Sequence, residues 1–180
     1  MASSMDRRWL RWATCTTLLN TCPLPTIPSC WPRRSPVELP SAVVFSIDPE
    51  IADTEAFGEG PETCANCVIV RGKRGDIEKY VACLVLATTR VDVNKVVRKK
   101  PDVRKASFAP IDEAVGMSGM EYGGITPVGL PAEWPIWIDP RVAEAEAVCI
   151  GSGLRSSKLI VSGGDVLSLS GAEVVAGLAN

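Results

Sequence analysis

The stretch "CVIVRGKRGDIEKYVACLVLATT", residues 67–89, predicts the centre of the fold. Two runs rich in valine, isoleucine and leucine, 67–72 and 79–89, lie on either side of the sequence "KRGD" at 73–76. Such runs around a glycine-containing turn indicate a β-hairpin. We therefore expect two antiparallel strands here, with the neighbouring segments packed against them.

The chain beyond the hairpin alternates irregularly between helical and extended patterns. Residues 111–120, "IDEAVGMSGM", predict a helix, and residues 141–147, "RVAEAEA", predict a helical turn or two. Apolar runs predict three further strands, at 134–140, 148–153 and 158–163. Hairpins mixed with crossovers favour an α+β fold with a mixed sheet over a doubly wound parallel sheet.

Two other helices are expected from residues that favour helix starts. At 46–57, Asp48 is a candidate N-cap, and Pro49 follows at the first helical position. Near the end of the chain, Ser170 and Glu173 have the spacing of a capping box. We expect that box to open a terminal helix over 171–179.

Composition separates a first segment from the rest of the chain. Residues 1–40 hold five arginines against two acidic residues, and six of the 14 prolines. Proline removes a backbone donor and restricts the residue before it, so we expect a poorly ordered leader over 1–40 and a globular domain over 41–180. The leader is compatible with a transit peptide, a native extension or a misassigned start.

The bulk composition excludes several classes of function. A net charge of −2 gives no global attraction to nucleic acid or membranes, and no apolar run is long enough for a membrane helix. The absence of histidine excludes Ser–His and Cys–His nucleophilic machinery within this chain. Cys64 and Cys67 form a CxxC pair, read either as a metal or redox site or as two ordinary cysteines that begin a strand. We expect no metal and no cofactor.

The stretch "EYGGITPVGL", residues 121–130, spends three glycines and a proline on one short segment. Adjacent glycines indicate either a plain turn or a backbone that approaches another group closely. In a chain without histidine, any catalysis has to rest on lysine, carboxylates, hydroxyls, backbone dipoles or the substrate itself.

The order of four motifs resembles the YbaK/EbsC family of aminoacyl-tRNA deacylases, related to the editing domain of prolyl-tRNA synthetases. From about residue 46 to the last helix, the motifs are "CANCVIV" (64–70), "GMEYGGITPVGL" (119–130), "WPIWIDP" (134–140) and "CIGSGLRSSKLIV" (149–161). The resemblance implies a mixed, partly closed, barrel-like sheet with flanking helices. It also implies hydrolysis, in trans, of the ester between tRNA and a mischarged small amino acid. The implied partners are the acceptor end of aminoacyl-tRNA and, as a further candidate, a synthetase, for a monomer in the cytoplasm.

The resemblance assigns candidate site residues to these motifs. "GGITP" matches a GxxxP loop of the family, and "GSG" matches a glycine-rich turn across the pocket. The candidate catalytic residues are Asn66, Gly123, Gly124, Thr126, Pro127 and Lys158. The candidate substrate-binding residues are Ile125, Gly151, Ser152, Gly153 and Asp139.

The chain departs from the family at the position of its usual lysine, where Asn66 stands. Lys158 occupies a position that is acidic in several relatives, so we hypothesise that the ammonium group has moved there and acts as an anchor or base. The alternatives are that Asn66 satisfies nearby backbone and that Lys158 faces solvent. A degenerate member that binds without hydrolysis is the second interpretation of the sequence.

The stretch "RVDVNKVVRKKPDVRK", residues 90–105, holds seven basic residues against two acidic ones. Its first part predicts an amphipathic helix over 91–100 that ends before Pro101. In the context of the resemblance it is a candidate contact for tRNA phosphates, and otherwise it is a solvated helix face. The candidate tRNA-binding residues are Lys95, Arg98, Lys99, Lys100, Arg104 and Lys105.

Overall fold

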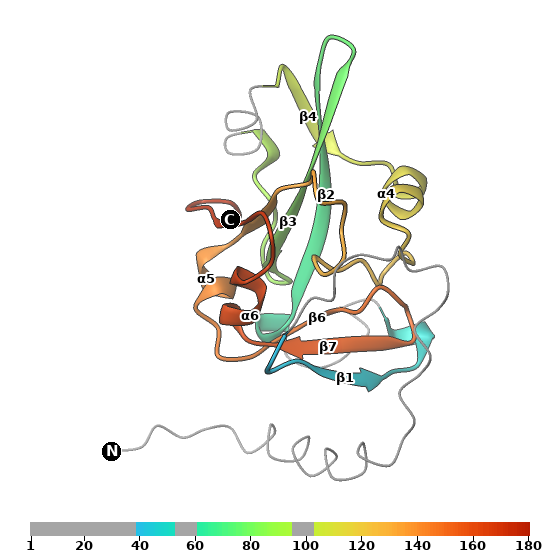
Figure 1. Cartoon of the computed structure of the whole chain (residues 1–180), viewed down its shortest axis with the longest axis vertical. Helices are drawn as coiled ribbons and strands as arrows, with labels where there is room; N and C mark the ends of the chain where they lie inside the picture. Colours follow the sequence, from blue (N-terminus) through green and yellow to red (C-terminus); the bar gives the residue numbers. More distant parts are fainter. Residues whose placement is uncertain (1–38, 53–60, 95–102) are drawn as a thin grey trace. The chain divides into compact units, whose positions relative to one another are not determined.

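The predicted hairpin forms the centre of the fold (Figure 1). In the computed structural model, which describes residues 39–52, 61–94 and 103–180, strands β2 (Ala65–Arg74) and β3 (Ile77–Leu86) pair antiparallel along their whole length. Gly75, with φ 63°, allows the tight turn between them. All described residues belong to one compact unit, Pro32–Asn180.

The hairpin lies within a mixed five-stranded sheet of order β4-β2-β3-β5-β8. Strand β4 (Lys105–Phe108) runs antiparallel to β2, whereas β5 (Ile136–Ile138) runs parallel to β3 and β8 (Ala172–Val174) runs parallel to β5. A second, antiparallel sheet has the order β1-β7-β6, with strands Val43–Ser46, Ser157–Val161 and Val148–Gly151. The isolated parallel bridge between Cys64 and Cys149 joins the start of β2 to β6. The predicted α+β class with a mixed sheet is confirmed.

The five-stranded sheet is apolar on both faces because alternate residues of β2 and β3 point to opposite sides. Ile69 and Leu84 point into the larger core, which also takes Ile150 and Leu159 from the second sheet. On the opposite face, a smaller core is formed by Val70, Val81, Cys83, Val85, Val91, Trp137, Val175, Leu178 and Ala179. The two sheets therefore share one core, and the C-terminal segment covers the other face.

Short helices flank the sheets. The predicted helix after residue 110 is confirmed as α4 (Ile111–Ser118), which ends at Gly119 in the left-handed conformation with φ 71°. The predicted N-cap Asp48 is also confirmed, since its side chain accepts a hydrogen bond from the Glu50 amide at the start of the 3-10 turn η1 (Pro49–Ile51). A second 3-10 turn, η2 (Pro61–Thr63), precedes β2, and α5 (Pro140–Ala143) follows β5. Within the described ranges, no helix is long and apolar enough to cross a membrane.

The predicted terminal helix is wrong. Gly171 adopts φ 79°, which a helix does not accommodate, and residues 172–174 form β8 instead of a helical turn. The backbone of this segment is bonded to β5 through Ile136 N to Gly171 O and Val175 N to Ile138 O, both at 2.9 Å. The capping box lies earlier, at Ser162 and Asp165, and opens α6 (Gly163–Leu167). Pairing with β5 and burial of the apolar tail thus outweigh the local helix signal.

Several predictions fall on residues outside the described ranges. The leader over 1–40 lies almost wholly outside them, as do 53–57 of the first predicted helix and 95–100 of the second. The edge strands β1 and β4, each of four residues, carry no alternating pattern that would have predicted them.

Candidate functional site

The glycine loop, residues 120–127, starts where α4 ends. The Gly124 amide donates to Glu121 O at 3.0 Å, and Gly123 adopts φ 77°. No acceptor within the described part of the chain is recorded for the amides of Gly123 and Ile125. The loop therefore uses the Gly124 amide internally, whereas the two amides on either side of it are not bonded to the described residues.

The glycine loop packs backbone against backbone on the glycine turn, residues 151–155. Gly153 N donates to Gly124 O at 2.7 Å, and Glu121 N donates to Gly153 O at 2.9 Å. A Cβ on Gly124 would lie 2.7 Å from the carbonyl carbon of Leu154, and one on Gly151 would lie 2.5 Å from Gly124 O. Any side chain at Gly124 or Gly151 would thus force the two segments apart, which explains why glycine stands at both positions.

Arg155 fastens the turn to two other segments. Its guanidinium donates to Tyr122 O and to Pro49 O, both at 3.0 Å, and lies 5.8 Å from the centre of the Tyr122 ring. The Arg155 amide donates to a Glu121 carboxylate oxygen at 2.7 Å. Sequence reasoning missed Arg155, although an arginine directly after a glycine turn is a signal that the turn is anchored.

Lys158 lies on the same side of β7 as the glycine contacts. It pairs directly with Gly151 of β6, and residues opposite one another in an antiparallel pair share a face. Lys158 is 7% exposed, and its Nζ donates to Ala52 O at 2.7 Å. The hypothesis that Lys158 faces solvent is therefore wrong: the ammonium group is buried beside the loop and turn.

Asn66 approaches the same side through the bridge between the sheets. Cys64 and Cys149 form the bridge, and Asn66 follows Cys64 by two positions just as Gly151 follows Cys149. Because residues two apart in a strand share a face, this register places Asn66 and Gly151 on the same side. Asn66 is exposed and so remains accessible to a ligand.

Two polar residues of the loop and turn are buried. Thr126 is 0% exposed, and its hydroxyl has no hydrogen-bond partner in the described part of the structure. Ser152 contacts the Ser157 hydroxyl at 2.7 Å and thereby closes the turn. Pro127 is buried directly after Thr126, and Ile125 packs against the larger core.

Asp139 has a structural environment apart from the loop and turn. It caps α5 through the Arg141 amide at 2.9 Å, and its two oxygens accept from the Arg141 guanidinium at 2.8 Å each. Burial acts to raise the pKa of Asp139, but the Arg141 hydrogen bonds outweigh burial and lower the pKa. Both carboxylate oxygens are thus already bonded within the fold.

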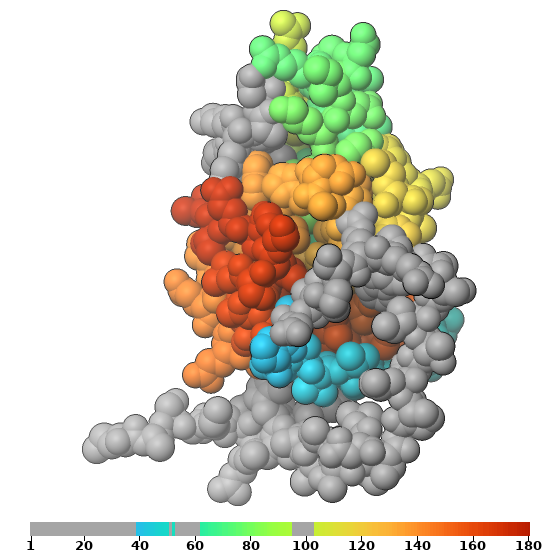
Figure 2. Space-filling model, in the orientation of Figure 1, coloured from blue at the N-terminus to red at the C-terminus, as the bar shows by residue number. Residues whose placement is uncertain are grey.

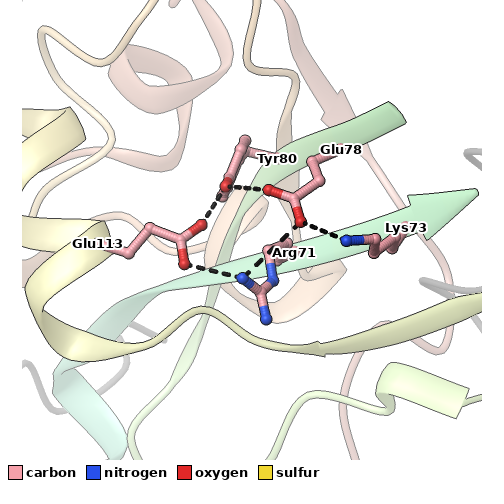
Figure 3. A network of polar contacts seen from close by, with 5 residues as sticks. All are labelled: Arg71, Lys73, Glu78, Tyr80 and Glu113. Atoms are coloured by element: carbon pink, nitrogen blue, oxygen red, sulfur yellow. Dashed lines mark hydrogen bonds and ion pairs between the residues drawn. The ribbon is translucent and has the colours of Figure 1, made fainter. Parts of the chain in front are cut away.

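A polar network anchors α4, and therefore the start of the glycine loop, to the hairpin (Figure 3). Arg71 of β2 donates to Glu113 of α4 at 2.9 Å, and the Tyr80 hydroxyl donates to the same carboxylate. Glu78 accepts from Lys73 at 3.3 Å and from Tyr80 at 3.2 Å. The hydrogen bond from Lys73 lowers the pKa of Glu78, while burial and then Glu113 raise the pKa of Tyr80.

A cavity of about 570 Å³ lies away from the loop and turn. It is lined by Gly72, Glu78, Lys79, Tyr80, Val81, Glu133, Trp134, Pro135, Trp137 and Glu173. Trp134 and Trp137 are each 3% exposed, and Trp134 stacks on Tyr80 at 5.1 Å, so both rings serve packing. The cavity shares no residue with the glycine loop. Converging backbone, rather than cavity size, defines the candidate site.

The cysteines of the CxxC pair lie at the start of β2 and form no disulfide among the described residues. Among the described residues, no group of three or more potential ligands could hold a metal ion. Burial, followed by the neighbouring Cys83, raises the pKa of Cys67, and burial raises the pKa of Cys83 to about 12. The Cys67 and Cys83 thiols are therefore poor candidates for thiolate chemistry.

Comparison with known proteins places the chain in a family. A family model described as an aminoacyl-tRNA editing domain matches residues 48–169. The chain belongs to the aminoacyl-tRNA editing domain family. The resemblance inferred from the four motifs is thereby confirmed, and the glycine loop, the glycine turn, Asn66 and Lys158 all fall within the matched region.

Solved structures show the same fold at low identity. "Hypothetical protein APE2540" is 18% identical with a TM-score of 0.67, over 78% of this chain and 92% of that one. "A putative trans-editing enzyme for prolyl tRNA synthetase" is 19% identical with a TM-score of 0.63, over 75% of this chain and 85% of that one. Editing domains of this family act on aminoacyl-tRNA, so the expected class of partner agrees with the family.

Proposed function

We propose that this chain is a trans-acting aminoacyl-tRNA deacylase that hydrolyses the ester of a small amino acid mischarged on tRNA. Family membership supports the substrate class. The observation that carries the proposal is the convergence of the glycine loop, the glycine turn and Lys158 on one side of the second sheet. This arrangement assembles polarising groups without histidine.

The reaction needs only water as a second reactant. Water attacks the carbonyl carbon of the ester, the bond to the ribose oxygen breaks, and a proton passes to that oxygen, which gives the free amino acid and tRNA. The amides of Gly123 and Ile125 are the donors we assign to the developing oxyanion. Pro127 limits the freedom of the loop and so reduces its reorganisation during the reaction.

The packing of the loop on the turn favours a small substrate. Gly124, Gly151 and Gly153 bring backbone against backbone, so no side chain at these positions can move aside to admit a large substrate. The Thr126 hydroxyl has no partner among the described residues, but it is fully buried, so we assign it to the polar part of the aminoacyl moiety only after a shift of the loop that uncovers it. A synthetase cannot sterically exclude amino acids smaller than its own substrate. An editing site that admits only small amino acids removes those errors and leaves the larger, correct amino acid on the tRNA.

Lys158 and Asn66 together take the role of the family's lysine in this proposal. Lys158 supplies a positive charge held in place by Ala52 O, and Asn66 supplies an exposed amide that donates and accepts. Because the Lys158 ammonium donates to a carbonyl, we assign it the role of an electrostatic anchor rather than a base. Ser152 is assigned to closing the turn, and Asp139 to the fold.

The remaining parts of the proposal concern partners and location. Arg104 and Lys105 are exposed and are assigned to phosphates of the tRNA, and Lys95, Arg98, Lys99 and Lys100, which lie outside the described residues, share that assignment. We propose a monomeric domain over 41–180 that acts in the cytoplasm, with a synthetase as a further partner, preceded by a leader over 1–40.

A second candidate function is binding of aminoacyl-tRNA, or of a small ligand like an amino acid, without hydrolysis. Two observations favour it: asparagine stands at the position of the family's lysine, and the Lys158 ammonium is bonded to the protein's own backbone. In that case the site would hold an ester without polarising it enough for water to attack.

The decisive experiment is a deacylation time course on tRNAs mischarged with alanine, serine, cysteine and threonine. We expect release of one or more small amino acids by the wild type, and at least about tenfold slower release by Lys158→Met and Asn66→Ala. Thermal melting of each variant separates loss of the site from loss of the fold. Arg141→Lys, at the Asp139 cap, is the matched control and should hydrolyse at the wild-type rate.

Two outcomes would contradict the proposal. Tight binding of an aminoacyl-tRNA that is never cleaved would establish the binding function instead. Wild-type rates in a folded Lys158→Met variant would exclude the anchor role of Lys158.

A further inference from the structure

The tip of the β2–β3 hairpin carries positive charge on the face that also holds α4. Lys105 of β4 pairs directly with Lys73 of β2, and Lys73 pairs directly with Glu78 of β3. Two residues earlier on β2, Arg71 points to the same face, where it contacts Glu113 of α4. Three cations from two adjacent strands therefore share one face with two carboxylates.

The Lys73–Lys105 pair is unfavourable in the free protein. Directly opposed residues of an antiparallel pair have Cβ atoms about 4.5–5.5 Å apart, and like charges at that position are destabilising. Glu78 compensates part of the repulsion, since it lies 3.3 Å from Lys73 Nζ and 4.0 Å from the Arg71 guanidinium. Among the described residues, neither the Lys105 side chain nor that of its neighbour Arg104 forms an ion pair or hydrogen bond.

The cations are open to a large partner. Lys73, Arg104 and Lys105 are all exposed, and the hairpin tip and the start of β4 lie side by side at one end of the described unit (Figure 2). Lys73 follows Asn66 by seven residues along β2, which at about 3.3 Å per residue is roughly 23 Å. A ligand that reached both places would have to be long and carry repeated negative charge.

We propose that Lys73 extends, together with Lys105, the phosphate contacts assigned above into a site for phosphodiester groups of RNA, at a distance from the glycine loop. The inference rests on the proposed function, because the acceptor arm of a tRNA whose end lies at the loop is such a ligand. A phosphate between Lys73 and Lys105 neutralises the opposed charges that Glu78 leaves uncompensated. The contact is sequence-independent and adds affinity without touching the ester.

The test measures binding of an unacylated, full-length tRNA transcript between 50 and 200 mM KCl. For the double variant Lys73→Met with Lys105→Met, loss of two phosphate contacts should reduce the slope of log affinity against log salt by about 1.8. The loss of affinity between those salt concentrations should then be roughly tenfold smaller than in the wild type. The thermal stability of the variant should change little, because loss of the exposed Lys73–Glu78 ion pair is offset by removal of the two opposed charges.

Lys79→Met is the matched control, since Lys79 is exposed on β3 but points to the opposite face of the sheet. The inference is overturned if the double variant keeps the wild-type salt slope, or if Lys79→Met reduces the slope equally. It is also overturned if inorganic phosphate stabilises the wild type but not the double variant while RNA affinity is unchanged, because the site would then serve a free anion.

Failure of this inference is distinguishable from failure of the proposed function. The binding measurement uses no ester, so a reduced slope together with no hydrolysis of any mischarged tRNA would support the RNA site and exclude the deacylase. Hydrolysis by the wild type with an unchanged slope in the double variant would leave the deacylase and exclude the RNA site.

Discussion

Substitution of Gly151 by alanine should damage stability and deacylation together. The added Cβ would lie 2.5 Å from Gly124 O and 2.6 Å from Ile125 O. Ordinary contact requires about 3.5 Å, so the glycine loop and β6 would have to separate by about 1 Å. Neither side offers a flexible side chain that could yield, because both contacts are to backbone atoms.

The expected cost follows from that displacement. Overpacking of this kind typically costs about 1–3 kcal/mol of unfolding free energy, or a fall in Tm of several degrees for a chain of this size. Displacing the Ile125 amide by about 1 Å would lower kcat for deacylation by up to about 100-fold. Thermal melting gives the first quantity, and single-turnover deacylation gives the second.

Gly116→Ala is the control for this prediction. Gly116 lies within α4, and a Cβ there would meet no atom within 4 Å. Alanine in a helix interior should increase stability by about 0.5–1 kcal/mol, with no effect on kcat. A Gly151→Ala protein with wild-type Tm and kcat would refute the argument that close backbone packing builds the site.

Three other predictions follow from the contacts described above. Arg155→Met should lower kcat for deacylation clearly while changing Tm little, because it releases Tyr122 O and Pro49 O at the surface. A kcat as little changed as the Tm would contradict the anchoring role. Arg141→Met should destabilise the fold by about 1–3 kcal/mol, since it leaves the Asp139 carboxylate buried without its guanidinium, as urea unfolding would show. The pKa of Asp165 is lowered by the hydrogen bond from Ser41, against the effect of burial, and further by Ser162. The stability that this capping box contributes should therefore be present above about pH 4 and lost as the pH falls further. Ser162→Ala should make the stability depend less on pH in this acid range.

The hairpin could be predicted from the sequence because its signal is local. Two apolar runs and one glycine turn define it, and the structure adds only the exact ends. Strand β8 could not be predicted in the same way. The spacing of Ser170 and Glu173 favoured a helix there, whereas pairing with the backbone of β5, more than 30 residues earlier in the chain, makes the segment extended.

The sequence indicated the glycine loop and the glycine turn, but not the contacts between them. The glycines at 123, 124, 151 and 153 indicated a loop and a turn, yet nothing in the sequence states that Gly124 lies against Leu154 or that its amide bonds to Glu121 O. The burial of Lys158 was equally hidden, since it depends on the register of β6 and β7. Contacts between distant segments decide all three, and a single sequence does not encode them visibly.

The same glycines explain how a chain without histidine could polarise an ester and why such a site would tolerate little change. Amides can reach a carbonyl oxygen only where no Cβ intervenes, and the loop and turn achieve this by contacting each other through backbone alone. Any side chain that separated them would move the amides of Gly123 and Ile125 at the same time as it weakened the fold. Asn66 and Lys158 contribute side chains rather than backbone, so they are the positions at which charge can change without disturbing this contact. Deacylation by Asn66→Ala and Lys158→Met variants therefore tests whether the backbone alone suffices for hydrolysis, or whether the reaction also needs the charge that Lys158 brings.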